Sequence, residues 1–147
     1  MQLSRDHRNV CVLALCQALY YVGQSIMFIL AGLVGADLSE NKALSTLPIT
    51  VIIIATALTT IPASLIMRRI GRKFGFMLGA TIAMIGSGIA SYGIYQSSFW
   101  LFVIGTMTIG VNGGFAQYFR FAAADVAEAD FKSKAISLVI SGGIIAA

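Results

Sequence analysis

The sequence predicts an all-α integral membrane protein, a bundle of transmembrane helices. Hydrophobic residues make up 58% of the 147-residue chain and charged residues only 11%, whereas soluble domains average about 25% charged residues. The apolar residues are gathered in long runs separated by short polar turns. A run of about 20 apolar residues is what a helix needs to cross the hydrocarbon core of a bilayer. The runs predict helices over residues 10–34, 43–67, 74–95, 99–121 and, cut short, 135–147.

The first element is a polar cytoplasmic tail, residues 1–9, followed by the helix predicted for residues 10–34. A basic tail before an apolar run is also how a signal peptide begins, but the apolar part of a signal peptide has only about 7 to 15 residues. The run that starts at Val10 is longer and can cross the bilayer with some tilt. We therefore expect it to be a retained transmembrane helix, and residues 10–147 to form a partial transmembrane bundle.

The second and third helices are joined by a loop that carries four cations. We call it the basic turn; its residues are Arg68, Arg69, Gly71, Arg72 and Lys73. A single charge at the centre of a bilayer costs about 2.5–3.5 kcal/mol, so the loop must face water. Because Lys and Arg concentrate in cytoplasmic loops, the basic turn is predicted to lie on the inner side of the membrane.

The fourth helix, residues 99–121, opens with Phe99 and Trp100, as in an interfacial aromatic belt. Residues 122–134 are polar and amphipathic and predict a short helix along the inner surface. The last apolar run, residues 135–147, would span only about 20 Å as a helix. We expect it to be the start of a fifth transmembrane helix, and the chain to be the front part of a larger protein.

The positive charges predict the orientation of the chain. All but one of its ten Lys and Arg residues fall in segments on the side of the basic turn, and only Lys42, between the first two helices, falls on the other side. This distribution predicts a cytoplasmic N-terminus and a location in the cytoplasmic, or inner, membrane.

Small residues recur along two of the predicted helices. Helices in lipid pack through small side chains, because lipid offers no hydrophobic reason for two helices to meet. We call one such stripe, in the third helix, the glycine seam; it consists of Gly75, Gly79, Ala83, Gly86, Ala90 and Gly93. We expect the glycine seam to be a packing surface, and we expect the same of Gly110 and Gly114 in the fourth helix.

Two groups of polar residues lie inside the predicted spans and are candidates for the lining of a substrate cavity. They are Gln17, Tyr20, Tyr21 and Gln24 in the first helix, and Asn112 and Gln117 in the fourth. Amides at membrane depth must find hydrogen-bond partners or face a water-filled cavity. The sequence supports both interpretations, hydrogen bonding between helices and an aqueous substrate path.

Arg120 is the charge that belongs to an apolar helix rather than to a loop. Its side chain can reach the inner surface, pair with Asp125 in an inner charge network, or meet an anionic substrate. The four complete spans contain no carboxylate. A proton relay through Asp or Glu is therefore not visible in this sequence.

Several function classes are disfavoured. The chain has no grouping of His with Ser or Cys, no metal-ligand spacing and no phosphate-binding loop, so we expect no enzyme, no cofactor and no metal site. The net charge of +4 does not indicate nucleic acid, because the cations mark the rims of membrane spans rather than one water-facing surface. The expected partners are the lipid bilayer and a small-molecule substrate.

The basic turn and the residues before it resemble a loop motif of the major facilitator superfamily, G-x-x-x-D-R-x-G-R-K. The residues that match the motif are Arg69, Gly71, Arg72 and Lys73. Two positions differ, because Ser64 stands at the first glycine and Arg68 at the aspartate. The position after the second helix, the inside orientation and the spacing all agree with the family.

The resemblance implies a bacterial secondary active transporter of twelve helices, of which this chain supplies the first four and the start of the fifth. It implies alternating access, in which two halves rock about a site near the bilayer midplane. The partners implied are a small solute, a coupling proton or ion, and the remaining C-terminal part of the same chain. The first and fourth helices would line the cavity. The basic turn would serve an inner gate, which the family latches through the aspartate that Arg68 replaces.

A different class of function also fits the sequence. The glycine stripes suit a small, self-contained oligomeric membrane protein that acts as a scaffold or assembly partner. A small dimeric multidrug exporter fits less well, because such exporters depend on a membrane-embedded carboxylate.

Overall fold

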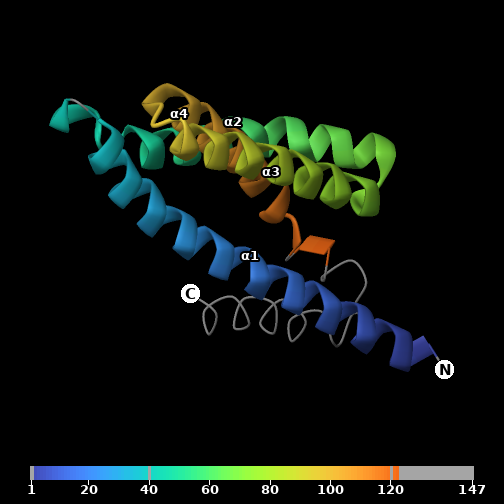
Figure 1. Cartoon of the computed structure of the whole chain (residues 1–147). Coiled ribbons are helices and arrows are strands. Elements are labelled where there is room, and N and C mark those ends of the chain that lie inside the picture. The colour runs from blue at the N-terminus through green and yellow to red at the C-terminus, as the bar shows by residue number, and fades with distance from the viewer. Residues whose placement is uncertain (1, 40, 120, 123–147) are drawn as a thin grey trace. The chain divides into compact units, whose positions relative to one another are not determined.

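The computed structural model describes residues 2–39, 41–119 and 121–122. Its elements are α1 (Gln2–Leu38), the 3-10 helix η1 (Lys42–Leu44), α2 (Leu47–Ile70), α3 (Arg72–Tyr95) and α4 (Phe99–Ala116) (Figure 1). The segment predicted along the inner surface, apart from Ala122, and the fifth helix predicted at 135–147 lie outside the described residues, as do Arg120 and Asp125.

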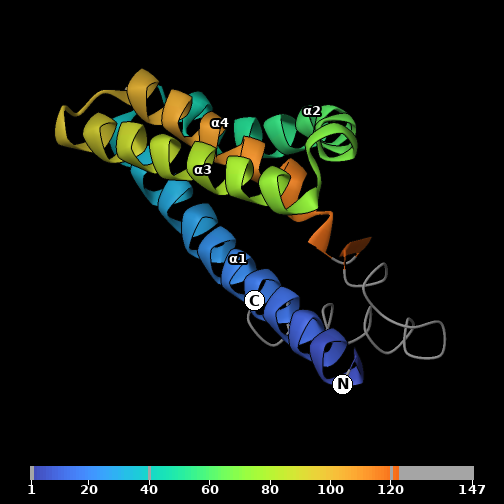
Figure 2. The same cartoon turned by 90° about the vertical axis from the view of Figure 1, so that its right-hand side faces the viewer.

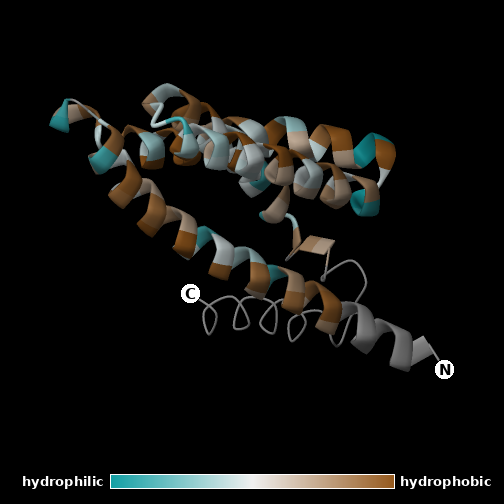
Figure 3. Ribbon diagram, in the orientation of Figure 1, coloured by the Kyte–Doolittle hydropathy of each residue, from teal (hydrophilic) through white to brown (hydrophobic). Residues whose placement is uncertain are grey.

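The helices are long and apolar enough to cross a membrane. Spans of this kind cover Cys11–Leu38, Lys42–Ile70, Arg72–Tyr95 and Phe99–Ala116. Apolar residues colour most of the length of each helix, and polar residues gather near the helix ends and in one stretch of α1 (Figure 3). The predicted all-α transmembrane fold is therefore confirmed.

The helix boundaries differ from the predicted ones where polarity was used to place them. α1 begins at Gln2, so residues predicted as a tail are helical from there on. Residues 2–9 contain neither Gly nor Pro, and a helix satisfies its own backbone hydrogen bonds in water as well as in lipid. α4 ends at Ala116 instead of residue 121, after Gly113 and Gly114, which have low helix propensity.

The start of α2 also lies later than predicted. The side chain of Asn41 accepts a hydrogen bond of 3.0 Å from the Ala43 N–H and caps the short helix η1. α2 then begins at Leu47, with Pro48 in its first turn, where the missing N–H of proline leaves no hydrogen bond unmade.

The described chain divides into two compact units. Unit 1 contains the described residues of Met1–Ile26 and Ala116–Ala147, and unit 2 is Met27–Phe115. Unit 2 therefore holds the last turns of α1 together with η1, α2, α3 and nearly all of α4.

Three members of the glycine seam, Gly79, Gly86 and Gly93, pack α3 against α4 in an antiparallel pair within unit 2 (Figure 2), whereas Gly75 faces Met67 of α2. A Cβ atom added at Gly93 would lie 2.6 Å from the backbone nitrogen of Phe102, and one at Gly86 would lie 2.9 Å from that of Ile109. Real Cβ atoms do not approach so closely, so these two backbones meet only because glycine is present. The predicted packing role of the seam is confirmed.

The opposite side of α4 packs against α2. A Cβ atom at Gly110 would lie 2.6 Å from the carbonyl oxygen of Ile52, and one at Gly114 would lie 2.7 Å from the Cβ of Thr59. The Thr56 hydroxyl also lies 2.8 Å from the carbonyl oxygen of Gly110 and makes a hydrogen bond between the two helices. The predicted packing role of Gly110 and Gly114 is thus confirmed, with α4 between α2 and α3.

The turn between α3 and α4 holds a serine in a left-handed conformation. Ser97 has φ 50°, its N–H donates to the Ile94 carbonyl at 3.0 Å, and the Ser98 N–H donates to the Gly93 carbonyl at 2.9 Å. This is the Schellman arrangement, in which glycine usually occupies the left-handed position. A residue with a side chain costs roughly 1–2 kcal/mol there.

Replacing Gly86 by alanine is expected to loosen the contact between α3 and α4. The added Cβ would lie 2.9 Å from the Ile109 nitrogen and 3.0 Å from the Gly105 carbonyl oxygen, so the backbones must separate, at a cost of about 1–3 kcal/mol. Thermal unfolding in detergent micelles, followed by circular dichroism, should show a lower apparent Tm.

Gly88→Ala is the matched control in the same helix, because none of the described atoms lies within 4 Å of its Cβ position. Its apparent Tm should equal or slightly exceed that of the unchanged protein, because alanine favours the helix. An equal loss of stability in both variants would contradict the seam contact.

Candidate functional site

The basic turn is built around one residue that ends α2 and begins α3. Gly71 is both the C-cap of α2 and the N-cap of α3, with φ 86° and ψ 155°. Its N–H donates to the Met67 carbonyl at 3.0 Å, and its carbonyl accepts from the Gly75 N–H at 3.1 Å. A single residue, Gly71, therefore forms the turn between α2 and α3.

The backbone conformation explains why this position holds glycine. The combination of φ 86° and ψ 155° falls in a region that residues other than glycine hardly enter, at a cost of order 1–3 kcal/mol. Space is not the constraint, because no described atom lies within 4 Å of a Cβ added at Gly71.

The four cations of the basic turn have different surroundings. Arg68, Arg69 and Lys73 are exposed, whereas Arg72 is half-buried. Arg68 and Arg69 lie in the last turn of α2, where the helix dipole favours positive charge. Arg72 and Lys73 lie in the first turn of α3, where the dipole disfavours positive charge.

The first turn of α3 carries this charge without an acidic residue of its own, and no side chain caps the helix there. Each unfavourable charge at a helix end costs typically about 0.3–1 kcal/mol. A carboxylate or another anion placed here would therefore be stabilised both by the cations and by the positive end of the helix dipole.

A second candidate feature is one face of α1. At about 100° of rotation per residue, the side chains of Gln17, Tyr20, Tyr21 and Gln24 fall within an arc of about 100°. Gln17 is only 7% exposed, and the other three are half-buried. We call these four residues the polar face of α1.

The side of α1 opposite the polar face is apolar and exposed. Leu15, Leu19 and Ile26 lie on this side and are 60%, 64% and 53% exposed. Such a surface suits contact with lipid tails. The two tyrosines of the polar face meet edge to face, with ring centroids 5.6 Å apart.

The structure places the two predicted α4 residues differently. The Asn112 side chain points toward α3, because its Oδ1 would lie 2.9 Å from a Cβ added at Gly79. Gln117 lies in a turn after α4 and is half-buried. Gln117 and the polar face of α1 belong to unit 1, whereas Asn112 and the basic turn belong to unit 2.

Sequence reasoning did not single out Thr56, which joins α2 to α4. Its hydroxyl lies 2.9 Å from the Ile52 carbonyl of its own helix and 2.8 Å from the Gly110 carbonyl. A hydroxyl within an apolar helix was the available signal, but many threonines bond only to their own helix. Within the described residues, no group of three His, Cys, Asp or Glu side chains is close enough to hold a metal ion.

Comparison with known proteins identifies a membrane transporter as a relative. The chain is 43% identical over 140 residues to the riboflavin transporter RfnT of Brucella anthropi, and the match covers 95% of this chain. It covers 35% of the relative, so the chain spans about a third of that protein's length. No protein-family profile matches the chain, and no solved structure matches it. The chain is thus an all-helical integral membrane protein related to a transporter.

Replacing Gly71 by alanine is expected to destabilise the basic turn by about 1–3 kcal/mol, through the backbone alone. The apparent Tm in detergent should fall although the added methyl group meets no described atom. Gly88→Ala, at a helical position that is equally open, controls for the added methyl group. An unchanged Tm for Gly71→Ala would show that the turn adopts another conformation at no cost.

Proposed function

We propose that this chain contributes helices to a secondary active transporter of a small solute that works by alternating access, as in the major facilitator superfamily. The observation that carries the proposal is the 43% identity, over 95% of the chain, to a riboflavin transporter. The match of Arg69, Gly71 and Arg72 to the superfamily loop motif adds support. The proposal places the protein in the cytoplasmic membrane with the basic turn inside.

The polar face of α1 is the proposed contact surface for the solute. Gln17 and Gln24 offer both donors and acceptors, and Tyr20 and Tyr21 offer ring surface together with hydroxyl groups. A planar heteroaromatic compound with polar edges, such as riboflavin, matches this combination. Asn112 packs toward α3, so its proposed part is to support the bundle.

The basic turn is proposed to form part of the inner gate. Its two cations at the start of α3 lie where the helix dipole opposes them, so an anionic partner would stabilise the closed gate. The acidic residue proposed for this is Asp125, in a charge network with Arg120, because the sequence predicts that both lie on the same inner side. The solute would be coupled to a proton or an ion.

Substitution of the amides on the polar face tests the solute contact. Gln17→Leu and Gln24→Leu are each expected to lower riboflavin uptake about tenfold, because a lost hydrogen bond of about 1.4 kcal/mol corresponds to that factor. Uptake is measured with labelled riboflavin in a riboflavin-requiring bacterium that expresses the complete protein carrying this chain.

Gln96→Leu is the matched control, because this exposed amide lies at the end of α3. It should leave uptake within about twofold. Equal losses in all three variants would assign the effect to stability rather than to the solute contact. No uptake by the unchanged protein would reject riboflavin as its solute.

Neutralising two cations of the basic turn tests the gate. Arg69→Gln combined with Arg72→Gln should abolish most transport while the protein still inserts, because the helices keep their apolar spans. Membrane insertion is checked by immunoblotting and by the accessibility of a cysteine introduced at Ser39. Arg68→Gln, at the position that departs from the motif, should change transport little. Unchanged uptake in the double variant would remove the gate role.

A further inference from the structure

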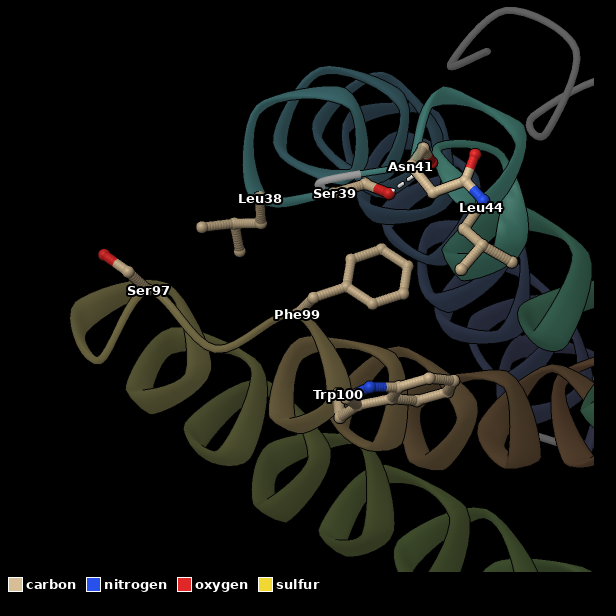
Figure 4. A pocket seen from close by; sticks show the side chains of 7 residues that line it. All are labelled: Leu38, Ser39, Asn41, Leu44, Ser97, Phe99 and Trp100. Carbon is tan, nitrogen blue, oxygen red and sulfur yellow. Dashed lines mark hydrogen bonds between the residues drawn. The ribbon is translucent and has the colours of Figure 1, made fainter.

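A pocket lies at the end of unit 2 opposite the basic turn. Its volume is about 350 Å³, within the range of small-molecule sites. It is lined by Leu38 at the end of α1, by Asn41 and Leu44 in the connection that follows, by Ser97 in the turn after α3, and by Phe99 and Trp100 at the start of α4 (Figure 4). By the predicted orientation, this end faces outside.

Two aromatic rings form one wall of the pocket. Phe99 and Trp100 meet edge to face, with ring centroids 5.6 Å apart and an angle of 76° between their planes. The Trp100 side chain is 62% exposed, so much of its indole surface is available to a ligand. Leu38 and Leu44 add apolar surface. A flat aromatic compound is the chemistry that such a wall favours.

Ser97 lies at the rim of the pocket, in a position where glycine is the usual residue, and its hydroxyl is directed away from Phe99 and Trp100 (Figure 4). Its φ of 50° is unfavourable for most residues with a side chain, with asparagine and aspartate as the exceptions. The Ser97 hydroxyl makes no hydrogen bond to the described part of the chain. A side chain kept in a strained turn beside a pocket points to a use for that side chain.

The facing connection supplies a fixed amide. The Asn41 side-chain oxygen accepts from the Ala43 N–H at 3.0 Å, and its main-chain oxygen accepts from the Ser39 hydroxyl at 2.6 Å. Both contacts hold Asn41 in place, and its Nδ2 group, which makes no hydrogen bond within the described residues, can donate to a ligand.

We infer that this pocket is an outer binding site for a planar heteroaromatic solute. The ring system packs against Trp100 and the leucines, and its polar edges bond to the Asn41 amide and, once the Ser97 side chain has rotated inward, to the Ser97 hydroxyl. The inference rests on the proposed function, because it takes the transported solute as the ligand. It adds a second place of contact, distinct from the polar face of α1.

The test uses riboflavin and the complete protein reconstituted in lipid vesicles. Riboflavin fluorescence is quenched when the ring stacks on indole, so saturable quenching reports binding at equilibrium, and uptake kinetics are measured in parallel. Trp100→Leu is expected to abolish part of the quenching and to raise KM about threefold to tenfold with Vmax unchanged. Trp100→Phe should keep KM within about twofold.

Tyr95→Leu is the matched control, because Tyr95 is 83% exposed near the same end and does not line the pocket. It should change neither quenching nor KM. Loss of quenching in Tyr95→Leu equal to that in Trp100→Leu, or an unchanged Trp100→Leu, overturns the inference. Quenching without uptake rejects the proposed function and keeps the pocket. Uptake that does not depend on Trp100 rejects the pocket and keeps the function.

A second pair of variants separates the Ser97 side chain from its backbone. Ser97→Gly relieves the strained turn, so the apparent Tm should rise by roughly 2–4 °C, while KM for riboflavin should rise about threefold because the hydroxyl is lost. Ser97→Asn tolerates the left-handed conformation, keeps a polar group and should retain most of the affinity. A higher Tm with unchanged KM for Ser97→Gly would assign Ser97 to the turn alone and remove it from the site.

Discussion

The close approach of α4 to two neighbouring helices is the constraint on which unit 2 depends. In lipid, apolar side chains gain nothing by leaving one apolar environment for another, so helices associate through dense packing and a few hydrogen bonds. Gly86 and Gly93 of α3 allow the backbone of α4 to approach on one side. Gly110 of α4 allows the backbone of α2 to approach on the other side. The bond from the Thr56 hydroxyl to the Gly110 carbonyl adds direction to that contact.

The two ends of unit 2 differ in their chemistry. At one end, the backbone of Gly71 reverses the chain within a single residue and crowds four cations together. The start of α3 therefore carries positive charge where its dipole is already positive. At the other end, Trp100 and Ser97 present ring surface and a hydroxyl. One end is thus suited to anions, and the other to a flat ligand with polar edges.

The sequence predicted the features that depend on neighbours along the chain. Apolar runs located α1, α2, α3 and α4, and the spacing of small residues located the glycine seam. Helix ends were missed because polarity does not end a helix, as α1 shows by beginning at Gln2. The direction of Asn112 and the bond of Thr56 depend on which helix lies beside them. The pocket combines residues such as Asn41 and Trp100 from two segments that lie far apart in the sequence. The periodicity of a single helix therefore cannot predict the pocket.

Trp100 is the single tryptophan of the chain, and its 62% exposure has a spectroscopic consequence. The ultraviolet emission of this chain arises mainly from one indole at one end of unit 2. The wavelength of that emission reports how far the indole is exposed to water. The polarisation of the emission reports how strongly the contact with Phe99 restricts the motion of the indole ring. The fluorescence emitted by this one side chain therefore reports the local environment of this end of unit 2. The tyrosines of α1 emit at shorter wavelengths.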